Sequence, residues 1–81
     1  MTAGSIVLSL AGRDKGRPHM VMALDGDFAV IADGKWRKIQ TPKRKKLKHL
    51  EPLPECGEYG MDVTNRELRQ IIAECRTKLG G

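Results

Sequence analysis

Aromatic side chains are scarce in this 81-residue chain, which contains one Phe, one Trp and one Tyr. Proteins that read single-stranded nucleic acids stack successive bases on several aromatic rings. Grooves that bind peptides and cages that bind modified side chains also need aromatic walls. The composition therefore disfavours an extended single-strand platform and makes a peptide-binding groove a poor fit.

Cysteine is nearly as rare, with Cys56 and Cys75 as the only two. They are too few for a disulfide framework and form no CxxC motif. We expect one thiol in a loop and one on a helix face, in a reducing compartment, so the predicted localisation is cytoplasmic. The sequence leaves open whether either cysteine has a redox role.

Long hydrophobic runs are absent. No stretch approaches the ~20 apolar residues that cross a bilayer, and the N-terminus lacks the pattern of a signal peptide. At this length the chain makes one small domain that buries only about 60% of its surface on folding. We expect no membrane association, and a monomer when the protein is free.

Catalytic and metal-binding patterns are also missing. His19 and His49, read as surface imidazoles, do not combine with the two cysteines in any zinc-site spacing, so we expect no metal. Ser5 and Ser9 have no nearby His in the sequence, and no Gly-rich phosphate loop is present. We therefore expect no enzyme activity, no cofactor and no small-molecule substrate.

The aspartates at 25, 27 and 33 look on paper like acidic pairs for general acid–base chemistry. Asp25 and Asp33 each precede a glycine. Asp is favoured there because its side chain accepts hydrogen bonds from the backbone of a turn. A turn role is the better interpretation of these residues.

Positive charge is concentrated in one segment. Eight Lys and Arg and no acidic residue lie between Lys35 and Lys48, whereas residues 1–34 and 51–81 are both slightly acidic. The formal net charge of +5 is therefore a local excess. Unrelieved like charges repel one another, which is tolerable when a polyanion is the partner, and clustered Lys and Arg are typical of nucleic-acid binding.

Short apolar runs separated by turn signals predict five strands. The expected strands are Ile6–Ala11, His19–Leu24, Phe28–Ala32, Trp36–Gln40 and Leu47–Leu50. Asp-Gly at 25–26 and at 33–34 are strong hairpin signals. Strands of this spacing suggest a mainly β fold, a small barrel or a sandwich. The first strands are apolar on both faces, so one face needs a further cover.

The C-terminal segment can supply that cover. After a connector over residues 55–63, Thr64 and Glu67 form a capping box that starts a helix. An apolar stripe follows at helical spacing: Leu68, Ile71, Ile72, Cys75 and Leu79. We expect the helix over residues 64–81 to pack on the β domain formed by residues 1–54. Arg69 and Arg76 lie at one margin of the stripe.

Three segments carry a resemblance to a known family. From Ile6 to Ala32, with Gly16 at the eleventh position among alternating apolar residues, the chain resembles a KOW motif. Continuing through GRDKGRP (12–18), DGK (33–35) and PKRKKLKHL (42–50), it resembles the KOW-containing large-subunit ribosomal proteins of the archaeal and eukaryotic type and their short stand-alone bacterial relatives. The resemblance covers residues 4–52; residues 55–81 match no family pattern.

The resemblance implies an SH3-like barrel that contacts RNA through the loop around the central glycine and through neighbouring basic loops. Carried onto this sequence, the expected RNA-binding residues are Arg13, Lys15, Gly16, Arg17, Lys35, Arg37, Lys38, Lys43, Arg44, Lys45, Lys46 and Lys48. Gly16 is expected to have a positive φ or to lie where the chain approaches RNA.

The sequence thus predicts a non-catalytic, ribosome-associated protein that binds structured RNA, most simply ribosomal RNA, through contacts to phosphates. Two alternatives stay open. The barrel or the C-terminal helix could be a protein-interaction module, or the same basic surface could bind DNA. The sequence does not show which RNA is bound. It also does not show whether the protein is a permanent ribosomal component or a transient factor.

Overall fold

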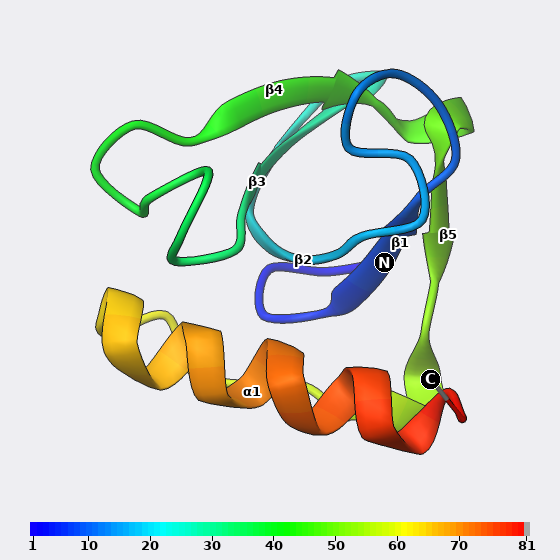
Figure 1. Cartoon of the computed structure of the whole chain (residues 1–81). Coiled ribbons are helices and arrows are strands. Elements are labelled where there is room, and N and C mark those ends of the chain that lie inside the picture. Colours follow the sequence, from blue (N-terminus) through cyan, green and yellow to red (C-terminus); the bar gives the residue numbers. More distant parts are fainter. Residues whose placement is uncertain (81) are drawn as a thin grey trace.

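The computed structural model describes residues 1–80, which form a five-stranded antiparallel sheet and one C-terminal helix (Figure 1). The strands are β1 (Ile6–Ser9), β2 (Pro18–Asp25), β3 (Phe28–Ala32), β4 (Lys43–Lys46) and β5 (Leu50–Pro52). Two short 3₁₀ helices, η1 (Leu47–His49) and η2 (Pro54–Cys56), flank β5, and α1 spans Asn65–Lys78.

The strand order is β4-β3-β2-β1-β5, so the first strand pairs with both the second and the last. Figure 1 shows that the sheet is curled. β4 and β5 stand at the two edges, and the sheet stays open. The mainly β class and the single helix are confirmed, but the expected closed barrel is not observed.

Neighbouring residues on a strand point to opposite faces of the sheet. Because the strands carry apolar residues at consecutive positions, both faces of the sheet are apolar. On one face, Ile6 and Met20 of the sheet pack against Leu68 and Ile72 of the helix. On the other face lies a second buried cluster: Val7, Val21, Ala29, Ile31 and Leu50. The predicted two-sided strands, and the helix that covers one side, are confirmed.

Local signals in the first part of the chain are also confirmed. Residues 13–16 form a turn in which Gly16 has a φ of 81°, as expected. Asp25-Gly26 begins the hairpin between β2 and β3, with Asp25 paired to Phe28. At the helix, Thr64 accepts from the Glu67 amide and Glu67 accepts from the Thr64 amide, completing the capping box.

Two predicted strands are wrong. Trp36–Gln40 is an irregular loop, because the Asp33 carboxylate accepts hydrogen bonds from the backbone amides of Lys35 and Arg37 and folds the chain into a tight turn. The alternation of apolar and basic residues in this segment is therefore not a strand pattern. The fourth strand is β4, and most of the predicted strand Leu47–Leu50 is η1, with Leu50 starting β5.

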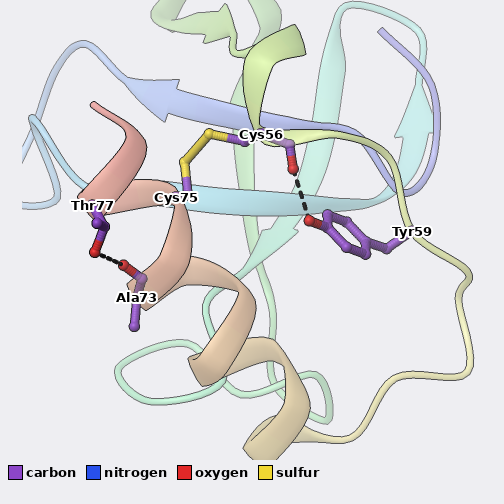
Figure 2. Close-up of a disulfide and its surroundings, with 5 residues drawn as sticks. All are labelled: Cys56, Tyr59, Ala73, Cys75 and Thr77. Carbon is purple, nitrogen blue, oxygen red and sulfur yellow. Dashed lines mark hydrogen bonds between the residues drawn. A yellow bond between two sulfur atoms is a disulfide. The ribbon is translucent and has the colours of Figure 1, made fainter. Parts of the chain in front are cut away.

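The two cysteines are joined in a disulfide between η2 and α1 (Figure 2). Their Cα atoms are 5.3 Å apart, and Tyr59 donates a hydrogen bond of 2.8 Å to the Cys56 carbonyl. The prediction of two separate thiols is therefore wrong, since the fold brings the loop and the helix face together. With 19 residues of separation, closing this loop stabilises the fold by about 3 kcal/mol in the chain-entropy account.

The predicted apolar stripe of the helix is buried in its middle and exposed at its end. Leu68, Ile72 and Cys75 are buried, and Ile71 is half-buried. Leu79 follows the last helical residue and is 43% exposed. Among residues 1–80, no helix combines the length and the apolar character that a membrane span requires.

Candidate nucleic-acid interface

The loop between β3 and β4 is held against the start of the helix. Arg69 donates a hydrogen bond of 3.0 Å to the Gly34 carbonyl, and the Ile39 amide donates to Asn65 Oδ1 at 2.9 Å. Gly34 has a φ of 81°, and a Cβ at this position would lie 2.4 Å from the Asn65 carbonyl oxygen. The Asp33 turn and these contacts with α1 fix the loop from both sides, so its tip is a defined surface feature.

Trp36 lies at that tip and is 65% exposed, more than any other large apolar side chain of the described chain. The Arg17 guanidinium carbon lies 5.4 Å from the indole centroid, and the Lys35 ammonium nitrogen lies 5.2 Å from it. Both distances are in the range of cation–π attraction. The fold therefore presents its only Trp to solvent between positively charged neighbours.

A hollow of about 190 Å³ is lined in part by Trp36. Four basic residues line it: Arg13, Arg17, Arg37 and Lys43. Arg13 and Arg17 come from the turn around Gly16, and Arg37 and Lys43 come from the basic segment that follows Asp33. The structure thus brings four of the predicted RNA-binding residues together at one concave surface, which we call the sheet-side hollow.

Two carboxylates also line this hollow, but both are occupied. Asp14 pairs with the Lys45 ammonium and lies 3.3 Å from that of Lys43, and it accepts from Ser9 at 2.8 Å. Although burial raises it, the pKa of Asp14 is held well below its usual value by the hydrogen bonds from Lys45 and Ser9 and by the two lysine charges. Asp33 is engaged by the backbone of its own turn.

The guanidinium groups of the sheet-side hollow keep their charge available. Within residues 1–80, Arg13, Arg17 and Arg37 form no ion pair with a carboxylate. Arginine presents a planar fork of donors that matches phosphate oxygens. The hollow can therefore hold an anion by charge-assisted hydrogen bonds.

His19 forms part of the wall of this hollow and is not the surface imidazole predicted from the sequence. It is 1% exposed, its Nδ1 lies 3.0 Å from the Arg17 carbonyl oxygen, and its Nε2 lies 4.0 Å from Asp33. Burial lowers the pKa of His19 despite the hydrogen bond to Arg17 and the nearby Asp33 charge. The neutral ring packs beneath the hollow and supports Arg17.

Lys45 lies inside the fold. Its side chain is 7% exposed, and its ammonium donates to Asp14, to Ser9 Oγ at 2.7 Å and to the Ala11 carbonyl. A phosphate cannot reach it without displacing these partners, so we remove Lys45 from the expected interface. These contacts of the Lys45 ammonium connect β4 to the turn that carries Arg13.

The rest of the basic run is divided by strand alternation. Lys43 and Lys45 point toward Asp14, whereas Arg44 and Lys46 point to the opposite side of β4. Arg44 stacks on Phe28 at 4.0 Å and pairs with Asp25 at 3.0 Å. Lysines on an edge strand also protect it from pairing with other chains, so these groups have a structural explanation of their own.

The other predicted site residues are exposed but dispersed. Lys15 and Gly16 lie in the turn before β2, and Lys38 lies in the loop before β4. Lys46 and Lys48 line a separate hollow of about 570 Å³ with Phe28. The structure therefore brings only part of the predicted set to one surface.

A second hollow of about 220 Å³ lies on the helix side of Trp36, and we call it the helix-side hollow. Its basic residues are Lys35, Arg69 and Arg76. Sequence reasoning placed Arg69 and Arg76 at a margin of the helix but left them, like Trp36, out of the expected interface. The sequence shows only that Arg69 and Arg76 lie on the same side of the helix. Folding is what brings that side of the helix beside the Asp33 turn.

No protein-family model matches the chain. Within the part that the structure describes, no group of three or more His, Cys, Asp or Glu side chains is placed to hold a metal ion.

Proposed function

We propose that this protein binds structured RNA without catalysing a reaction, with ribosomal RNA as the expected target. The cytoplasmic location predicted from the sequence loses its argument, because the Cys56–Cys75 disulfide is not typical of a reducing compartment. The observation that carries the proposal is the sheet-side hollow. Arg13, Arg17 and Arg37 converge there, without carboxylate partners in residues 1–80, around an exposed Trp. Binding to phosphates is the use that best fits such a group.

The fold supports the proposal in part. The resemblance implies an SH3-like barrel, and the five-stranded antiparallel sheet, in which β1 lies between β2 and β5, is compatible with an open version of it. The turn around Gly16, expected to contact RNA, contributes Arg13 to the hollow. Both arguments are consistent with a KOW-type role.

A catalytic alternative finds little support at the one place where a serine meets a lysine. Ser9 Oγ lies 2.7 Å from the Lys45 ammonium, but Ser9 is 1% exposed and its hydroxyl is already bonded to Asp14. A substrate carbonyl has no path to this oxygen. The cluster is a buried structural network that positions the turn.

A protein-interaction role finds weaker support than RNA binding. Trp36 is the only exposed aromatic side chain of the two hollows, and its neighbours there are mainly cationic. An aromatic groove for a peptide needs more than one ring. The charge around Trp36 favours a polyanion.

The test is a salt titration of affinity for a structured RNA, with a DNA duplex of matched length as control. Four phosphate contacts predict a slope of log affinity against log salt of about −3 to −4. The double variant Arg13→Gln/Arg37→Gln should weaken binding and make the slope shallower by roughly 1 to 2. The matched control is Lys46→Gln/Lys48→Gln, which removes the same charge from residues outside the sheet-side hollow and should leave the slope nearly unchanged.

Three outcomes would count against the proposal in different ways. Affinity that does not respond to salt would exclude phosphate contacts as the mechanism. An equal effect of the control pair would show that the sheet-side hollow is not the interface. Equal affinity for the DNA duplex would remove the assignment to RNA and leave the phosphate-binding surface in place.

A further inference from the structure

Trp36 stands between two basic hollows that the sequence did not connect. The sheet-side hollow carries Arg13, Arg37 and Lys43, and the helix-side hollow carries Lys35, Arg69 and Arg76. Trp36 and Asp33 line both. A nucleic-acid strand that contacts the indole would therefore have a basic hollow within reach on the sheet and another on the helix.

The exposure of Trp36 has no structural explanation within the fold. The ring is 65% exposed although the turn that carries it is fixed by Asp33 and by contacts with α1. Its contacts with Arg17 and Lys35 are cation–π contacts at an exposed site, which are weak and can be exchanged for a ligand. An indole held at the tip of a fixed turn is suited to stack on a flat ligand group.

We propose that Trp36 stacks on one unpaired base of the RNA, while the phosphates on either side of that base occupy the two hollows. The inference rests on the proposed function and specifies its substrate class: a structured RNA with a bulged or looped-out nucleotide. It also makes Arg76 of the helix, which lies outside the family resemblance, a contact residue.

An unpaired base follows from geometry. Inside a regular helix both faces of a base are covered by its neighbours, so a protein ring reaches a base face only when the base is splayed out. A platform for several successive bases needs several rings, and Trp36 is the only exposed ring at this site, since His19 is 1% exposed. The arrangement therefore fits one displaced base and does not fit a long single strand.

The experiment compares two RNA hairpins that differ only by a single bulged adenosine, at one fixed salt concentration. Stacking of one base on an aromatic ring predicts that the parent protein binds the bulged hairpin about 5- to 150-fold more tightly. Trp36→Ala should remove most of this preference, and Trp36→Phe should restore part of it. Leu24→Ala is the control, since Leu24 is also a large exposed apolar residue, 45% exposed, outside both hollows.

A second measurement needs no variant. Trp36 is the only Trp in the chain, so intrinsic fluorescence reports on it alone. Stacking should quench the emission on addition of the bulged hairpin and much less on addition of the paired one. Thermal unfolding of each variant checks that the fold is retained.

The helix-side hollow is tested with Arg76→Gln. Its matched control is Arg66→Gln, the same change on the same helix outside the hollow. Arg76→Gln should make the salt slope for the bulged hairpin shallower by about 1, and Arg66→Gln should not.

The outcomes separate this inference from the proposed function. Salt-dependent binding of both hairpins with equal affinity, or an equal loss for Trp36→Ala and Leu24→Ala, would overturn the stacking inference and leave RNA binding in place. Failure to bind either hairpin would overturn both.

Discussion

Lys45 and Lys46 are adjacent and chemically identical, yet the fold gives them opposite environments. The side chain of Lys45 is 7% exposed and paired with Asp14, whereas Lys46 is exposed at the sheet edge. Lys45→Met removes one positive charge from the interior of the fold, and Lys46→Met removes one from its surface. We expect Lys45→Met to destabilise the fold strongly and Lys46→Met to leave it nearly unchanged.

The magnitude follows from the partners that Lys45 would leave behind. Removing one member of a buried ion pair costs about 3 to 5 kcal/mol, because the other charge stays buried without its partner. Asp14 would keep Ser9 at 2.8 Å and Lys43 at 3.3 Å, so we expect the lower end, about 3 kcal/mol. Surface changes such as Lys46→Met usually stay within about 0.5 kcal/mol.

The assay is thermal unfolding followed by far-ultraviolet circular dichroism. Fluorescence would be a poor probe, because Trp36 is already exposed in the folded state. For a domain of this size about 3 kcal/mol corresponds to a fall in Tm of roughly 12–24 °C. Adding Asp14→Asn to Lys45→Met removes the buried charge and should recover part of the loss.

One result would refute this reasoning. If Lys45→Met melts like the parent but binds RNA more weakly than Lys46→Met does, then Lys45 is a phosphate contact, as the sequence predicted, and its burial is not what the fold depends on.

Two further predictions concern the supports of the candidate interface. Since burial lowers the pKa of His19 below 6.5, the unfolded chain takes up the proton more readily, so stability should fall as pH drops through 6.5 and below. His19→Gln should flatten that part of the profile in urea unfolding, and an unchanged profile would assign the loss to other groups. Gly34→Ala and Gly16→Ala both place a side chain at a φ of 81°, costing about 1 kcal/mol or more each. Only Gly34→Ala also forces a Cβ against the Asn65 carbonyl, so it should lower the Tm clearly further than Gly16→Ala; equal losses would mean that the loop moves away freely.

Local signals predicted much of the fold because their physics is local. The strand Phe28–Ala32, the hairpin at Asp25-Gly26 and the capping box of Thr64 and Glu67 each depend on residues a few positions apart. The prediction of a strand over Trp36–Gln40 was wrong for a related reason. The alternation of apolar and basic residues in this segment favours a strand. The Asp33 carboxylate instead accepts hydrogen bonds from two backbone amides and folds the segment into a turn.

The candidate site was predictable only in part. The positive charge of residues 35–48 and of the turn around Gly16 can be read directly from the sequence, and Arg13, Arg17, Arg37 and Lys43 do meet at one hollow. The sequence does not show that Lys45 is consumed by Asp14, because a buried lysine and an exposed one look alike in a basic run.

What the sequence by itself determined is therefore the mainly β class, the covering helix, most turns and the location of charge. Tertiary structure alone decided that β1 lies between β2 and β5 in an open sheet, that Cys56 meets Cys75, and that Arg69 and Arg76 approach Trp36. Those contacts join segments far apart in the chain. Periodicity specifies which residues share a face of an element, but which face becomes the interior depends on what packs against it.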